Sequence, residues 1–76
     1  MDFKEYLMTR RVTDTPAGDF IQDAQNDKNF PDTNDWAKIE FYLLTRRACD
    51  EARHEARKVY KRWLRAEMRK REASGK

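Results

Sequence analysis

The sequence predicts an all-α protein, a compact bundle of four helices whose last helix is long and basic. Apolar residues recur at helical spacing in four segments, turn-forming residues separate these segments, and strand-like alternation does not extend over any length. The 76 residues are enough for one domain. We expect this domain over residues 1–72, followed by a disordered C-terminal tail over residues 73–76.

The composition indicates a small globular domain with wide polar faces. Charged residues make up 41% of the chain and apolar residues 38%, while aromatic residues, at 12%, supply large pieces of core and argue against disorder. The longest apolar run, residues 41–44, is far below the ~20 residues that span a bilayer. Charges also stand near the N-terminus, where a signal peptide would be apolar. We therefore expect a cytoplasmic protein without membrane contact.

The first expected helix begins at Phe3 and ends near Arg10. Phe3, Tyr6 and Leu7 have the i, i+3, i+4 spacing of one helical face, and Asp2 is placed to cap the free backbone N–H groups. The basic pair at residues 10–11 suits the negative end of the helix dipole.

The second expected helix starts at Pro16. Proline cannot extend the preceding helix, but its fixed φ suits the first turn of a new one. The expected buried face consists of Ala17, Phe20, Ile21 and Ala24.

Residues 26–35 are rich in turn formers, and Pro31 favours an extended conformation at Phe30, which we expect to fill the core from a loop. Thr33 or Asn34 is expected to cap the third helix. The apolar face of that helix consists of Trp36, Ile39, Tyr42 and Leu43.

The fourth expected helix runs from Asp50 to about Glu72 after a short turn. Its apolar stripe consists of Ala52, Ala56, Val59, Tyr60 and Trp63. At the usual rise this helix is about 34 Å long, more than a bundle of ten-residue helices can cover. Its final turns must therefore overhang or fray.

A six-residue stretch is repeated in similar form, because residues 6–11 match residues 42–47 at an offset of 36 positions. The first and third helices can therefore pack in similar ways. Both duplication and convergence on one favourable helix end account for the match.

The chain resembles the small bacterial YozE-type proteins. The residues that carry the resemblance are Phe3-x-x-Tyr6-Leu7, Asp19-Phe20, Phe30-Pro31 and Ile39-x-x-Tyr42-Leu43, with aromatic residues late in the last helix. The resemblance covers about residues 3 to 63 and implies a compact fold like the sterile alpha motif (SAM). It implies no defined biochemical function, although sterile-alpha-motif relatives bind protein, RNA or DNA. The basic continuation beyond Trp63 departs from the pattern.

No arrangement of residues indicates an enzyme, a cofactor, a metal site or a small-molecule substrate. Cys49, expected as a small core residue, would lie about 140° from His54 on a helix, so the two cannot act as a nucleophile and base. His54 is expected to form an exposed pair with Asp50.

Acidic residues spaced by four, Asp19, Asp23 and Asp27, give the second helix an acidic face. This face suits solvent or the basic last helix better than a cation. Residues 32–35 resemble part of a calcium loop but lack its glycine and distal glutamate.

Charge is divided unequally along the chain, with −4 over residues 1–45 and +7 over residues 46–76. Between residues 57 and 71 there are eight basic residues and one acidic residue. This arrangement predicts phosphate contacts to DNA or RNA. The expected nucleic-acid-binding residues are Arg57, Lys58, Lys61, Arg62, Arg65 and Arg69.

Two other readings of the last helix remain open. The charges can form a solvated face, in which Glu55 pairs with Lys58 and Glu67 with Arg71. Alternatively, the overhanging end can pack on a protein partner or on a second copy, because Leu64 and Met68 form an apolar i, i+4 pair. A membrane-surface helix is disfavoured because the apolar face beyond Trp63 is sparse.

The predicted core collects the apolar faces of all four helices and the loop phenylalanine. It consists of Phe3, Tyr6, Leu7, Phe20, Ile21, Phe30, Trp36, Ile39, Leu43, Val59, Tyr60 and Trp63.

Overall fold

The protein folds into four helices, as predicted. The computed structural model describes residues 1–74, with side chains described through Lys70. The helices are α1 (Phe3–Thr9), α2 (Pro16–Asn26), α3 (Trp36–Thr45) and α4 (Asp50–Ser74), and no strand occurs within residues 1–74. None of the helices in this described part combines the length and apolar character needed to cross a membrane.

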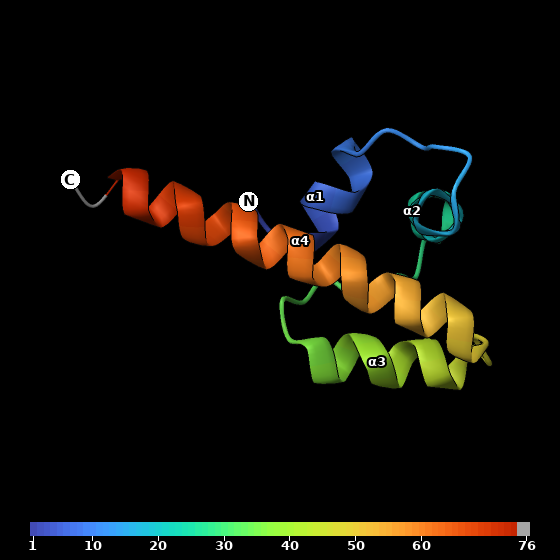
Figure 1. The fold of residues 1–76 in the computed structure, drawn as a ribbon. Coiled ribbons are helices and arrows are strands. Elements are labelled where there is room, and N and C mark those ends of the chain that lie inside the picture. Colours follow the sequence, from blue (N-terminus) through green and yellow to red (C-terminus); the bar gives the residue numbers. More distant parts are fainter. Residues whose placement is uncertain (75–76) are drawn as a thin grey trace.

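Helix α4 is the element on which the other three are arranged. Figure 1 shows α1 and α2 on one side of α4 and α3 on the other, with the C-terminal part of α4 projecting beyond them. The helix is described through Ser74, two residues past the predicted end at Glu72. The last two residues of the expected tail, 75–76, lie outside the described residues.

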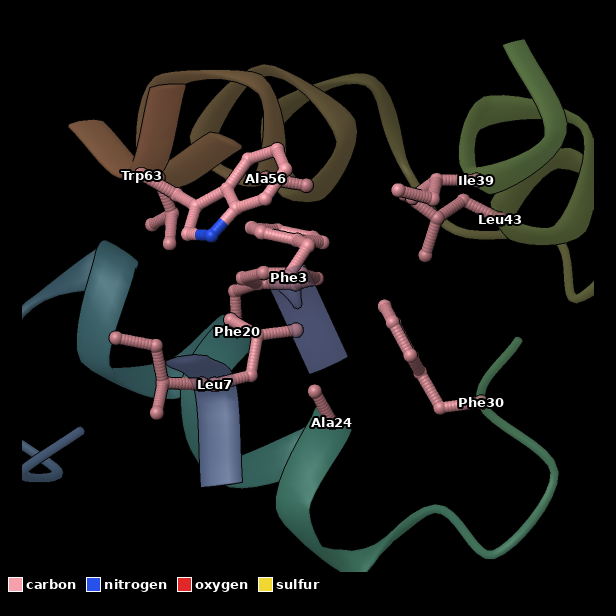
Figure 2. Packing of buried hydrophobic residues seen from close by; sticks show 11 residues of the cluster. Phe3, Leu7, Phe20, Ala24, Phe30, Ile39, Leu43, Ala56 and Trp63 are labelled. Atoms are coloured by element: carbon pink, nitrogen blue, oxygen red, sulfur yellow. The ribbon is translucent and has the colours of Figure 1, made fainter. Parts of the chain in front are cut away.

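Nine of the twelve predicted core residues are buried, and the core is dominated by aromatic and branched side chains (Figure 2). Tyr6, Trp36 and Tyr60 are only partly buried and pack against its edge. Two alanines, Ala24 and Ala56, allow α2 and α4 to approach the cluster closely. The fully assembled cluster consists of Phe3, Leu7, Phe20, Ile21, Ala24, Phe30, Ile39, Leu43, Ala56, Val59 and Trp63.

Phe3 joins the start of the chain to α4. Its side chain is completely buried, and its ring centroid lies 5.1 Å from that of Tyr60 and 5.6 Å from that of Trp63. The indole Nε1 of Trp63 donates to the carbonyl of Met1 at 2.9 Å. The first residues of the chain are thereby attached to α4 both by ring packing and by a hydrogen bond.

Asn34 has a different role from the predicted one. Its Oδ1 accepts a hydrogen bond from the backbone N–H of Phe3 at 2.9 Å, and its carbonyl accepts from the Tyr60 hydroxyl at 2.5 Å. Asn34 therefore satisfies the start of α1 across 31 positions of sequence. The N-cap of α3 is Asp35, whose Oδ1 accepts from the N–H of Ala37 at 3.0 Å.

The predicted similarity of α1 and α3 is visible where these helices end. The matched residues are Tyr6, Thr9 and Arg10 in α1 and Tyr42, Thr45 and Arg46 in α3. In each helix the threonine hydroxyl donates to the tyrosine carbonyl, and the guanidinium lies over the tyrosine ring, at 4.4 Å in α1 and 5.6 Å in α3. Such a pair stabilises the last turn by cation–π attraction.

The two helices then end differently. At the end of α3, Arg47 adopts a left-handed conformation with φ of 58°, and the N–H of Ala48 donates to the carbonyl of Leu43 at 3.0 Å. This pattern is a Schellman motif built without glycine. The chain of α1 instead continues in an extended conformation from Arg10.

Two predictions at the start of α4 are wrong. Cys49 is exposed and is not a core residue, because it precedes α4 in the turn where the chain reverses. Asp50 bonds to Arg53, one turn along the helix, and not to His54. The guanidinium of arginine reaches the carboxylate at i, i+3, where it also adds charge to the hydrogen bond.

The turn between α1 and α2 is packed tightly against the first turn of α2. Thr15 caps α2 by accepting from the N–H of Gly18 at 3.0 Å, and Pro16 occupies the first helical position, as predicted. A Cβ atom added at Gly18 would lie 1.9 Å from the carbonyl oxygen of Thr13. Only glycine leaves room for this backbone contact.

We expect Gly18→Ala to lower the free energy of unfolding by about 1–3 kcal/mol, because the turn must move away from α2. Alanine by itself would favour a helix by about 1 kcal/mol. Thermal and urea unfolding measure the net effect, and a variant more stable than the parent would contradict the close contact.

Tyr42 and Asp27 form the hydrogen bond that joins α3 to the end of α2, with 2.5 Å between the Tyr42 hydroxyl and Asp27 Oδ2. This bond lowers the pKa of Asp27 below its ordinary value. Burial, together with the same bond, raises the pKa of Tyr42. The charged carboxylate and the neutral phenol are therefore the forms that the fold favours.

We expect Tyr42→Phe to destabilise the fold by about 1 kcal/mol at neutral pH. The stabilisation from Asp27 is complete above the unfolded carboxyl pKa of about 3.9 and is lost as the pH falls through the lower folded-state value. Melting temperatures of both proteins should thus converge in acid. If the two melting temperatures differed by the same amount at pH 2 and at pH 7, this result would contradict the hydrogen bond between Tyr42 and Asp27.

Candidate nucleic-acid interface

Five of the predicted residues form a continuous basic stripe along the exposed side of α4. The basic stripe consists of Lys58, Lys61, Arg62, Arg65 and Arg69, and each of these residues is exposed. At 100° per residue they share about one third of the helix circumference, whereas Val59 and Trp63 face the core. The structure therefore places them together as predicted.

The sixth predicted residue, Arg57, is separated from the basic stripe. Its guanidinium lies 5.8 Å from the centroid of the Trp36 ring, on the side of α4 that faces α3. Lys58, its neighbour, points about 100° away around the helix. Arg57 consequently contributes to the contact between α3 and α4.

Two further cations face the basic stripe across a groove of about 620 Å³. Arg10 and Arg11, at the end of α1, line one wall, and Lys58 and Arg62 of α4 line the other. We call this the basic groove. The sequence shows Arg10 and Arg11 as a pair, but their sequence context indicated only a role at the helix terminus.

The wall that carries Arg10 is held by Gln25 of α2. The Gln25 Nε2 donates to the carbonyl of Leu7 at 2.9 Å and to that of Arg10 at 2.8 Å. Both carbonyls lie at the C-terminal end of α1, where the Leu7 carbonyl also accepts from the N–H of Arg10 at 3.2 Å. The Arg10 guanidinium also rests on Tyr6. These contacts fix the backbone and the side chain of Arg10.

Acidic side chains near the basic stripe are few and already engaged. Glu55 lies 3.3 Å from the ammonium of Lys58, as predicted. Glu67 instead contacts the N-terminal amino group of Met1 at 3.4 Å. The predicted partner of Glu67, Arg71, has its side chain outside the described part. Positive charge therefore dominates the side of α4 that carries the basic stripe.

The described residues do not show a metal site. No group of three or more His, Cys, Asp or Glu side chains in this part of the chain could hold a metal ion. The guanidinium and ammonium groups that line the basic groove can bind anions.

Comparison with known proteins identifies one family. The model of the YozE SAM-like fold matches residues 3–65. No match was found among curated proteins or solved structures. The matched segment includes all of the buried cluster and ends at Arg65, within the basic stripe.

We expect Gln25→Ala to destabilise the protein by about 1–2 kcal/mol, because the Arg10 carbonyl loses its donor and the Leu7 carbonyl keeps only the N–H of Arg10. The end of α1 should then loosen and the amide protons around Arg10 should exchange faster. Hydrogen exchange read by NMR checks this. Gln22→Ala, an exposed change on the same helix, is the control and should leave the rates unchanged.

Proposed function

We propose that this chain, which belongs to the YozE SAM-like family, binds nucleic acid through the phosphate backbone. The observation that carries this proposal is the basic groove, where Arg10 and Arg11 from one element meet Lys58 and Arg62 from another. Cations that come from two elements surround an anion better than a row on a single helix. Cations that only contact solvent would not need to come together from two elements.

The length of the basic stripe suits a polyanion. From Lys58 to Arg69 it extends about 16 Å along the helix axis, a length over which duplex DNA carries about ten phosphate charges. A small anion would occupy only part of it. The guanidinium groups of Arg62, Arg65 and Arg69 can each bind phosphate oxygens in a bidentate manner.

The surroundings of the basic stripe favour a duplex over a single strand. Proteins that bind single strands stack bases on exposed aromatic rings. Near the basic stripe, Trp63 is buried and Tyr6 is covered by Arg10. The most exposed aromatic residue of the core helices, Phe41, lies on α3. We therefore propose contacts to a double-stranded backbone without reading of the base sequence.

Removal of three stripe cations should weaken binding strongly. We expect Lys61→Ala/Arg62→Ala/Arg65→Ala to reduce the affinity for a short duplex at least tenfold at low salt. The slope of log K against log salt should fall by about 2.7, since each phosphate contact contributes about 0.9. Fluorescence anisotropy between about 50 and 200 mM salt measures both quantities.

The matched control removes three charges elsewhere. Lys4→Ala/Lys28→Ala/Lys38→Ala has the same net charge, and all three residues lie outside the basic stripe and the basic groove. Its affinity should stay within about twofold of the parent. If both triple variants lost the same affinity for the duplex, net charge alone would account for the effect. If the stripe variant lost no affinity, the proposal would be refuted.

Arg10→Ala/Arg11→Ala tests the second wall of the basic groove separately. We expect the salt slope to fall by about 1.8, as two phosphate contacts disappear. An unchanged slope would restrict the interface to α4.

A further inference from the structure

A second groove is lined mainly by acidic side chains, and we call it the acidic groove. It has a volume of about 590 Å³ and is bounded by α2, the end of α3 and the first turns of α4. Its apolar floor consists of Phe20, Leu43, Ala48 and Ala52. Its rim carries Asp19, Asp23, Asp27, Glu51 and Glu55, with Arg46 as the one basic lining residue.

The overhang of α4 is the part beyond Trp63, and it exposes apolar surface at the other end of the same helix. Leu64 is 38% exposed and Met68 is 61% exposed, one helical turn apart. Lys61 and Arg65 flank this pair on the helix surface. The overhang therefore has an apolar centre with cations beside it, which is the chemical complement of the acidic groove.

We propose that the acidic groove of one copy binds the overhang of α4 from a second copy. Leu64 and Met68 enter the apolar floor, and Lys61 and Arg65 face the acidic rim. The volume of the groove is in the range that holds a small organic ligand, so it can accept two such side chains. The contact deepens the predicted self-association of this domain and does not depend on nucleic-acid binding.

The groove cannot be filled by the overhang of its own chain. Glu51 and Leu64 belong to one continuous helix and are separated by about 20 Å along its axis. The helix would have to break for its end to return to its beginning. The occupant with this complementary surface is thus supplied by another molecule of the same chain.

A twofold symmetric dimer does not satisfy both surfaces. Two overhangs packed together would place Arg65 and Arg69 of one copy beside the same cations of the other, which is unfavourable. Glu51 and Leu64 also point about 140° apart around α4, so the groove and the overhang face different directions. The contact is therefore heterologous and propagates as an open, head-to-tail chain.

The apolar pair of the overhang points away from much of the basic stripe, although Lys61 and Arg65 belong to both surfaces. Leu64 points about 160° away from Arg62 around the helix. Apolar substitutions can therefore test self-association while the basic stripe remains complete.

The first experiment measures mass by sedimentation over increasing protein concentration. The average mass of the parent should rise past that of two copies and should fall as salt is added. Leu64→Gln/Met68→Gln should remain monomeric at the same concentrations while it keeps its affinity for duplex within twofold. A parent that stays monomeric, or a mass that stops at two copies, would overturn the proposal.

The second experiment exchanges the charges of the two surfaces. Asp19→Lys/Asp23→Lys reverses the rim, and Lys61→Glu/Arg65→Glu reverses the overhang. Each variant alone should be monomeric because its two surfaces now repel, and an equimolar mixture should regain the mass of the parent. A mixture that remains monomeric contradicts the pairing.

The control for the rim variant is Glu5→Lys/Asp32→Lys, which has the same net charge and changes exposed residues outside the groove. It should associate like the parent, and circular dichroism should show that all variants keep their helices. A parent that stays monomeric but binds an added lysine-rich peptide in the groove would assign the surface to another protein and overturn the proposal for a second copy.

Discussion

The burial of Phe3 against α4 is the contact on which the remaining structure depends. Its ring lies between α1 and the aromatic pair Tyr60 and Trp63, and its N–H is satisfied by Asn34 of the loop before α3. One residue thereby connects α1, α4 and that loop, and Figure 2 shows Phe3 in the buried cluster with Trp63 of α4. Because α1 is only seven residues long, it would not be stable alone. Its position, and hence that of Arg10 in the basic groove, follows from this packing.

Helical periodicity was enough to predict the four helices and their part of the core, because burial repeats with the pitch of each helix. Phe30 was predicted from the effect of Pro31 on the loop before it. The long-range role of Asn34 could not be predicted this way, since hydrogen bonds across 31 positions depend on how the helices are placed. The same reason applies to Arg10 opposite Lys58. Cys49 was misjudged because a small apolar residue carries little information when it lies in a turn.

Charge is separated in space, but along a different boundary from the one in the sequence. Acidic side chains of α2 and of the first turns of α4 surround one groove, and cations of α1 and the middle of α4 surround another. Glu55 lines both grooves and marks the boundary between them. The family match accounts for the bundle through residue 65, whereas the remainder of α4 adds charge that the core does not require. The two proposed binding modes share Lys61 and Arg65, whereas Leu64 and Met68 serve self-association alone.

The contact between Phe3 and Trp63 also affects the order in which the protein folds. These residues lie near opposite ends of the domain, so Phe3 cannot be fully buried until most of α4 has been made. Helices α2 and α3 can form earlier because their hydrogen bonds are local. The contact between Phe3 and Trp63 forms only when the whole segment between these two residues has closed into a loop. Loop closure of this kind slows folding relative to helical bundles with local contacts. A nascent chain would therefore keep the Phe3 side of α1 exposed until Trp63 has been made.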